Sequence, residues 1–239
     1  MSVFAVLDPA VGLAHDVVAS LAQLVPTALA IVLFTVCVRL ALHPLARAAA
    51  RGEKSRARLA PKVAELNRKH KGKPEKLQAA LAELYREEKA SPFAGCLPML
   101  IQIPFFSVMY RLFTTPNDLL GHTLFGVPLG LHAGSAQSAA QWVVFGALYA
   151  GLAAVGYVNF RRARRAQAAA PKQPAQPGQP GQAGLMAVMP YLSFGTVLFA
   201  ALVPLAAALY LLTTSAWSAA ERGWLHRGGT APVPAVALI

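Results

Sequence analysis

The sequence predicts an all-α polytopic membrane protein: a five-transmembrane-helix bundle with a cytoplasmic helical hairpin and an outer interfacial amphipathic helix. Three observations lead to this fold class. Hydrophobic residues make up 56% of the 239-residue chain and charged residues only 13%, which is unlike a soluble domain. Four long apolar stretches interrupt the chain, and the last is long enough for two spans. Lys and Arg gather between and after these stretches.

The charges predict which side of the membrane each segment faces. Thirteen of the 22 basic residues lie between Leu45 and Ser91, and five more lie between residues 161 and 172. The first 38 residues contain no Lys or Arg, and Asp118 is the only charged residue of the segment 114–139. Because Lys and Arg accumulate in cytoplasmic loops, we expect the N-terminus and this loop outside and the C-terminus in the cytoplasm.

Residues 1–24 form the predicted extracytoplasmic amphipathic segment. Its apolar residues recur every three or four positions, which places them on one helical face: Leu7, Val11, Ala14, Val18, Leu21 and Val25. Such a helix lies in the membrane interface. The first transmembrane helix is expected over residues 25–45.

Residues 46–91 predict a cytoplasmic hairpin of two antiparallel helices. Two narrow apolar stripes flank the breaker "KGKP" at 71–74, and they consist of Leu59, Val63 and Leu66 and of Leu77, Leu81 and Leu84. The two helices would bury these stripes against each other and leave a basic exterior.

Four further transmembrane helices are expected within residues 92–218, with an outer loop at 114–139. Pro98 and Pro104 predict a kink in the first of them. The next, at about 140–160, carries Ala147 and Gly151 one turn apart for a close helix contact.

The last apolar run, 185–218, would be about 50 Å long as one helix, too long for one span. Two short helices joined by an outside turn near Phe199–Pro204 fit it better. A disordered cytoplasmic linker is expected over 161–184, because Pro, Gln, Gly and Ala dominate its composition. Residues 219–239 form a cytoplasmic tail.

The residue inventory predicts neither an enzyme nor a metal or cofactor site. The six histidines lack the spacing of metal ligands, and no nucleophile is paired with a base. None of the five predicted spans contains Asp or Glu, which counts against a proton- or sodium-coupled transporter.

Arg39 is the full charge inside the predicted spans, and the residues alone leave two interpretations open. It lies five residues, or about 7 Å, before Pro44, so it could reach the inner headgroups by snorkelling. Alternatively it faces water within the membrane region and marks a functional site, with Thr35 one turn away on the same face.

The stretch "SPFAGCLPMLIQIPFFSVMY" at 91–110 resembles the signature "NPxxGCLPxLIQxPxFxxLY" of the YidC-type membrane protein insertases, a superfamily that includes the mitochondrial and chloroplast insertases. "TVCVRLALHPL" (35–45) and "VPLAAALYLLTTSAW" (203–217) resemble the family's first and last core helices. The resemblance covers about residues 3–218. One departure is that Leu211 replaces the second residue of an aromatic pair and Thr214-Ser215 replaces Ser-Asn.

The resemblance implies a membrane protein insertase and chaperone in the bacterial plasma membrane. A hydrophilic groove open to the cytoplasm would receive acidic translocated segments, and apolar helices would leave laterally into lipid, with or without the Sec channel. By correspondence of motifs, the implied substrate-binding groove consists of Arg39, Thr35, Gln102, Phe106, Tyr210 and Leu211. Arg39 would be its cation, Thr35 and Gln102 its neutral polar groups, and the other three its surface for the apolar helix.

The implied partners are nascent membrane proteins, with the Sec translocon, the ribosome or targeting factors at the basic loops, and anionic lipids. A transporter or channel subunit is the alternative function, although an inverted repeat and a filter-like loop are missing. A basic regulatory protein that binds anionic lipid would explain the charges but not the Gly-Cys-Leu-Pro stretch.

Overall fold

The computed structural model describes residues 7–70, 72–88, 97–169 and 188–225, and these are mostly helical. The α-helices are α1 (Asp8–Ala22), α2 (Thr27–Ala41), α3 (His43–Lys69), α4 (Pro74–Glu87), α5 (Leu97–Thr114), α6 (Ala139–Ala169), α8 (Gly195–Ala200) and α9 (Leu205–Leu225). Shorter elements are the 3-10 helices η2 (Asp118–Gly121), η3 (Ala133–Ser135) and η4 (Met189–Phe194) and the strands β1 (Thr123–Leu124) and β2 (Val127–Pro128). The all-α class is confirmed.

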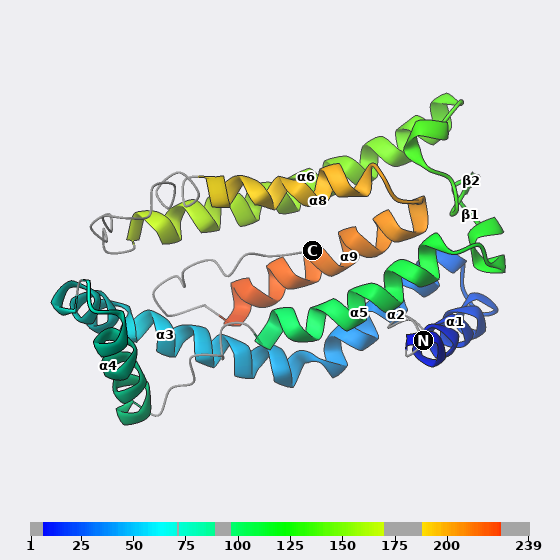
Figure 1. The fold of residues 1–239 in the computed structure, drawn as a ribbon. Coiled ribbons are helices and arrows are strands. Elements are labelled where there is room, and N and C mark those ends of the chain that lie inside the picture. Colours follow the sequence, from blue (N-terminus) through cyan, green and yellow to red (C-terminus); the bar gives the residue numbers. More distant parts are fainter. Residues whose placement is uncertain (1–6, 71, 89–96, 170–187, 226–239) are drawn as a thin grey trace.

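Helix α9 lies at the centre of the bundle. It packs against α2, α5, α6 and α8, and Figure 1 shows it between α6 and α8 on one side and α2 and α5 on the other. Its N-terminal half is rich in buried small and apolar residues: Leu205, Ala206, Ala207, Ala208, Tyr210 and Leu211. Small side chains allow helices to approach closely.

The predicted close contact of the 140–160 helix occurs at Gly151. A Cβ atom there would lie 3.2 Å from Cδ1 of Leu212 on α9. Ala147, the other residue of the predicted pair, is exposed. The expected turn near Phe199–Pro204 is also present, because α8 ends at Ala200 and α9 begins at Leu205.

The segment 114–139 folds into a compact cap at one end of the bundle. Strands β1 and β2 pair antiparallel through a two-residue turn in which Phe125 (φ 50°) and Gly126 (φ 80°) are both left-handed, as the right-handed twist of a tight hairpin requires. The backbone amides of Leu205 and Ala206 donate to the carbonyls of Leu131 and Leu129, each at 2.9 Å. The cap thus satisfies amides that the start of a helix leaves unpaired.

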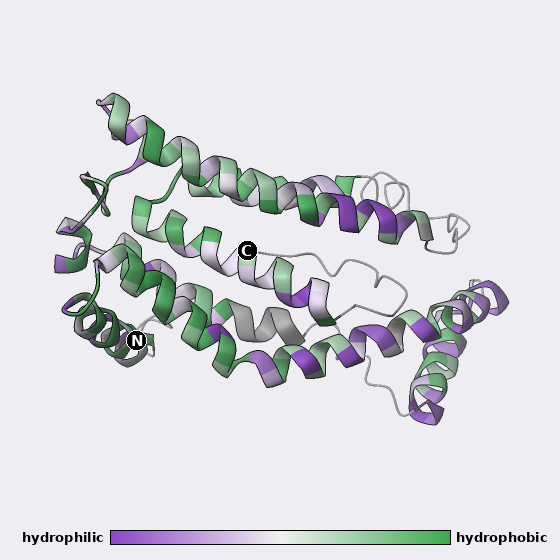
Figure 2. Cartoon of the chain, turned by 180° about the vertical axis from the view of Figure 1, so that it is seen from behind, coloured by the Kyte–Doolittle hydropathy of each residue, from purple (hydrophilic) through white to green (hydrophobic). Residues whose placement is uncertain are grey.

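The opposite end of the bundle, which we call the basic end, consists of α3, α4 and the C-terminal part of α6. Figure 2 shows hydrophilic residues gathered there and hydrophobic residues along the bundle. Helices α3 and α4 pack on each other, with Leu59 and Leu84 buried, as the two stripes predicted. Helix α3 leaves α2 at an angle of 55°.

The structure corrects three boundaries that the sequence suggested. The first helix ends at Ala41 rather than 45, because Pro44 cannot donate to the carbonyl four residues earlier and its ring clashes with that carbonyl. Helix α6 continues through Ala169, so the linker expected over 161–184 begins later; Ala, Arg and Gln are good helix formers. The tail expected over 219–239 begins as helix, up to Leu225. Residues 170–187 and 226–239 lie outside the described residues.

Among the described residues, fewer helices pass the length and composition required of a membrane span than the sequence predicts. By length and composition, α6 is the described helix able to cross a membrane by itself, and α2 with α3 would be a second if the bent pair forms one span. The five-span bundle is therefore not confirmed and stays a proposal.

Candidate functional site around Arg39

Arg39 lies in the last turn of α2 and reaches across the bundle to α9. Its Nε–H donates to Oγ1 of Thr214 at 2.8 Å, and its Nη2 donates to the same oxygen. The arginine is half-buried and Thr214 is buried. Arg39 also lies within electrostatic reach of Tyr210, Glu221 and Arg222. The guanidinium is therefore directed into the bundle, against α9.

The other expected polar groups of the groove are Thr35 and Gln102. Thr35 is fully buried, and its hydroxyl donates to the Ile31 carbonyl of its own helix at 2.7 Å. Gln102 lies on α5, but its side chain is outside the described part of the structure. A partner of Arg39 is Thr214, which the sequence presented only as part of the Thr214-Ser215 replacement for Ser-Asn.

The three residues expected to contact the apolar helix of a substrate lie in two different clusters. Tyr210 and Leu211 are each only 2% exposed. The Tyr210 ring packs against Phe105 and Phe113, with ring centroids 6.1 and 6.3 Å away. Phe106 is half-buried, and its ring lies 6.0 Å from that of Phe199 on α8. These three side chains do not form one exposed surface here.

A second polar contact between the same helices lies at the basic end. Nδ1 of His43, one turn after Arg39, shares a hydrogen bond with Oε1 of Glu221 on α9. The two side chains are 24% and 12% exposed. The His43 ring also lies 5.8 Å from that of Trp224, and the Arg47 guanidinium lies 5.2 Å from the same indole. Because the sequence assigned Glu221 to the tail, it missed this contact.

Helix α6 holds the end of α9 from the other side. Nη1 of Arg162 donates to the backbone carbonyl of Ala219 at 2.5 Å. The close fit continues at Gly223, where a Cβ atom would lie 2.7 Å from Nη2 of the same arginine. We call His43, Arg47, Arg162, Glu221 and Trp224 the α9 clasp, since they tie the last turns of α9 to α3 and α6.

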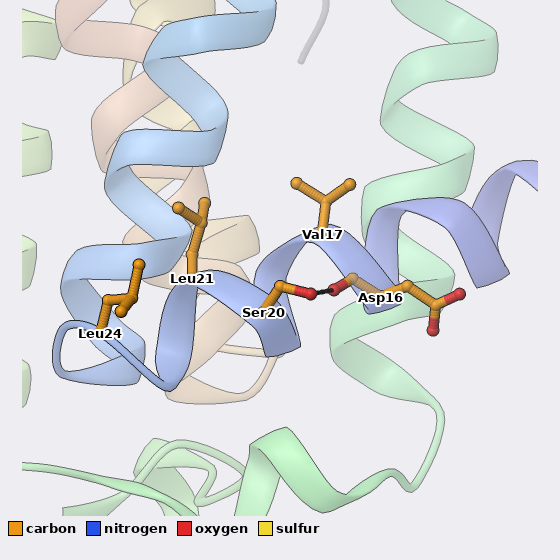
Figure 3. A pocket seen from close by; sticks show the side chains of 5 residues that line it. All are labelled: Asp16, Val17, Ser20, Leu21 and Leu24. Carbon is orange, nitrogen blue, oxygen red and sulfur yellow. Dashed lines mark hydrogen bonds between the residues drawn. The ribbon is translucent and has the colours of Figure 1, made fainter.

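A shallow depression of about 330 Å³ lies far from this site, on α1. It is lined by Asp16, Val17, Ser20, Leu21 and Leu24, and Figure 3 shows the Ser20 hydroxyl donating to the Asp16 backbone while the Asp16 carboxylate points away. The lining is mostly apolar, and among the described residues it includes none of the predicted site residues.

The apolar stripe predicted for α1 faces the protein. Ala14 and Val18 are buried, and α1 packs against α2 and α5. Leu13, Val17 and Leu24 lie on the exposed side instead. The helix is thus apolar on two faces, and the exposed one is suited to a membrane interface.

Within the described residues, no group of His, Cys, Asp and Glu is arranged to hold a metal ion. The arrangement around Arg39 is suited to binding rather than to catalysis. A cation and hydroxyls attract and orient an anionic group, but they do not form a nucleophile activated by a general base.

Comparison with known proteins places this chain in a family. The family model described as "60Kd inner membrane protein" matches residues 19–231. Among similar proteins, each named "Membrane protein insertase YidC", one from Helicobacter pylori is 45% identical over 90 residues, one from Caulobacter vibrioides 41% over 98 and one from Pelagibacter ubique 46% over 88.

These three matches cover 38%, 41% and 36% of this chain and 16% of each relative. The name of these relatives describes an insertase rather than an enzyme, in agreement with the prediction from the residues. Since the family model matches most of the chain, from the end of α1 into the residues after α9, the chain belongs to the 60Kd inner membrane protein family, the YidC-type proteins.

Proposed function

We propose that this chain is a membrane protein insertase and chaperone. Family membership and the shared name of the relatives support the general activity. The observation that carries the proposal for this chain is Arg39, a cation of α2 directed into the helical bundle at Thr214 of α9. Snorkelling would instead direct this side chain along the helix toward headgroups.

In the proposed mechanism, Arg39 attracts the acidic residues of a client segment that must cross the membrane. Electrostatic attraction is stronger where water is partly excluded, and the half-buried guanidinium is in such a place. Thr214 holds the guanidinium until a client carboxylate replaces the hydroxyl as acceptor, because hydrogen bonds between charged groups are stronger than those to a neutral one. No nucleotide is consumed in this step.

The proposal includes five spans formed by α2, α5, α6, the pair η4–α8 and α9. The basic end would lie in the cytoplasm, because it carries most of the Lys and Arg. The N-terminus and the cap formed by 114–139 would lie outside, in a bacterial plasma membrane. Of the three residues expected to contact the apolar helix of a client, Phe106 is partly exposed and accessible. Tyr210 and Leu211 would become accessible only if α9 moved.

The proposed clients are nascent membrane proteins. The positive charge on the exterior of α3 and α4 would attract anionic lipid and the ribosome or targeting factors. Cooperation with the Sec translocon belongs to the same proposal and follows from the resemblance alone.

The test is insertion of a small single-span client with an acidic N-terminal tail in cells depleted of their resident insertase. We expect wild type and Arg39→Lys to restore insertion and Arg39→Ala to reduce it about tenfold, as loss of a charged hydrogen-bonding partner does. Insertion is measured by protease accessibility of the tail.

The control client carries the same span with Asn and Gln in place of its acidic residues. Arg39→Ala should insert this client as wild type does. Equal insertion of the acidic client by wild type and Arg39→Ala would remove Arg39 from the mechanism, and failure of wild type with both clients would contradict the insertase function itself.

A further inference from the structure

Glu221 occupies an unusual position for an acidic residue in this chain. It is the only Asp or Glu after Asp118, and it lies seven residues, or two turns, after Thr214 on α9. Its side chain is only 12% exposed. A carboxylate this far removed from water carries a desolvation cost that a merely solvated surface charge avoids, so its contacts need an explanation.

The contacts of Glu221 point toward the candidate site. Its Oε1 accepts a hydrogen bond from His43, one turn after Arg39, and its charge attracts the Arg39 guanidinium. Arg222 repels the same guanidinium but is exposed to solvent, where its charge is screened more strongly. The chain itself thus places one carboxylate within electrostatic reach of Arg39.

The α9 clasp holds this carboxylate in place. Arg162 of α6 binds the Ala219 carbonyl, and Trp224 packs on His43 and Arg47. Tied from both sides, the last turns of α9 cannot easily swing away, so the Glu221 charge stays beside His43, one turn from Arg39.

We propose that Glu221 determines specificity by acting as an internal competitor of the client's acidic segment. Its negative charge partly neutralises the attraction of Arg39 and repels approaching carboxylates, so only segments with enough negative charge bind. This inference rests on the proposed function, because it assumes that acidic segments are what Arg39 binds.

The test uses the purified full-length chain in detergent micelles and a short fluorescent peptide with several aspartates, compared with the same peptide carrying asparagines. Glu221→Gln keeps the shape of the side chain and removes the charge. We expect it to lower the Kd for the aspartate peptide about threefold or more at low salt, since one close repulsive charge is removed. The Kd for the asparagine peptide should not change.

Two variants serve as controls. Glu65→Gln makes the same change of charge on the exposed face of α3 and should leave both Kd values unchanged. Glu221→Asp keeps the charge and should bind the aspartate peptide as weakly as wild type, which a purely structural role of the longer side chain would not produce. Helical circular dichroism and a single elution peak show that each variant is folded.

The inference is overturned if wild type and Glu221→Gln bind the aspartate peptide with the same Kd, or if neither binds it. This outcome is distinct from failure of the proposed function, which is read from the insertion of clients by wild type in cells. An insertion-competent chain with equal Kd values would keep the function and discard the role of Glu221.

Discussion

At the residue scale, the hydroxyl groups of the bundle fall into two kinds. Thr35, Ser107 and Thr213 donate to carbonyls four residues earlier in their own helices, so their side chains are satisfied locally. Thr214 instead accepts from a side chain of another helix. A local bond satisfies a polar group without linking helices, whereas a bond between helices fixes how they face each other.

This difference predicts unequal effects of two neighbouring substitutions. Thr214→Val removes the acceptor of a partly buried guanidinium and should lower the free energy of unfolding by about 1–3 kcal/mol. Thr213→Val removes only a bond within α9 and should cost less than about 0.5 kcal/mol. Thermal unfolding in detergent micelles, followed by tryptophan fluorescence, measures both. Equal effects would show that the Arg39–Thr214 bond adds nothing to stability.

At the element scale, the position of α9 depends on small residues where helices cross. Gly151 of α6 lies against Leu212, and Gly223 of α9 lies against Arg162. Each glycine makes room for one long side chain of the neighbouring helix. One glycine belongs to α6 and the other to α9, and the two contacts lie at different positions along the helix pair, so together they set the line along which α6 and α9 pack.

Gly151→Leu should therefore destabilise the bundle. The new side chain would begin 3.2 Å from Leu212 Cδ1 and force α6 and α9 apart, at a cost of about 1–3 kcal/mol. Gly146→Leu is the matched control, because a Cβ atom there meets nothing within 4 Å and both substitutions gain the same helix propensity. A lower melting temperature for Gly151→Leu than for Gly146→Leu is the expected result. The reverse order would contradict the close α6–α9 contact.

At the scale of the whole molecule, the two ends of the bundle are held together by different means. The basic end has the α9 clasp. At the other end, His15 Nε2 of α1 hydrogen-bonds to Asp118 Oδ1 of the cap at 2.7 Å, Arg111 of α5 donates to Asp8 of α1, and the Thr27 hydroxyl of α2 hydrogen-bonds to His122 of the cap. The contacts of Asp118 with His15 and of Asp8 with Arg111 are exposed, so water and pH act on them directly.

The pair of His15 and Asp118 predicts a pH dependence of stability. The hydrogen bond that His15 donates to Asp118, with a smaller contribution from Asp16, raises the pKa of His15 above its usual 6.5 despite partial burial. A raised pKa in the folded state means that the stabilisation is fully present below pH 6.5 and is lost as pH rises through the higher folded value. Correspondingly, the hydrogen bond from His15 lowers the pKa of Asp118 below 3.8. The stabilisation contributed by this carboxylate is therefore lost only as pH falls below 3.8 through the lower folded value.

The measurement is the melting temperature between about pH 6 and pH 8. Wild type should lose stability over this range relative to Asp118→Asn, because the variant has no carboxylate for the imidazolium. His15→Gln should remove the same slope. A wild-type curve parallel to that of both variants would show that this pair does not contribute to joining α1 to the cap.

Much of the helical organisation could be predicted from the sequence, because it depends on local patterns. The two apolar stripes of the hairpin, the turn near Phe199–Pro204 and the contact at Gly151 are present. Helix ends were less predictable: the continuation of α6 through Arg161–Ala169 depends on good helix formers that composition alone grouped with the following linker. The cap was missed, since a two-residue turn at Phe125-Gly126 has the glycine but not the usual Asn or Asp before it.

For the candidate site too, some features could be predicted from the sequence and others could not. The sequence by itself determined the helical and apolar character, the separation of basic and acidic segments and the choice of Arg39 as the candidate cation, because hydropathy, charge and motif are properties of the linear chain. Only the tertiary structure decided that Thr214 rather than Thr35 binds Arg39, that Tyr210 and Leu211 are buried, and that Glu221 meets His43. The physical reason is that each of these outcomes depends on how α9 is rotated against α2, and that rotation is set by the packing of the whole bundle rather than by either helix alone.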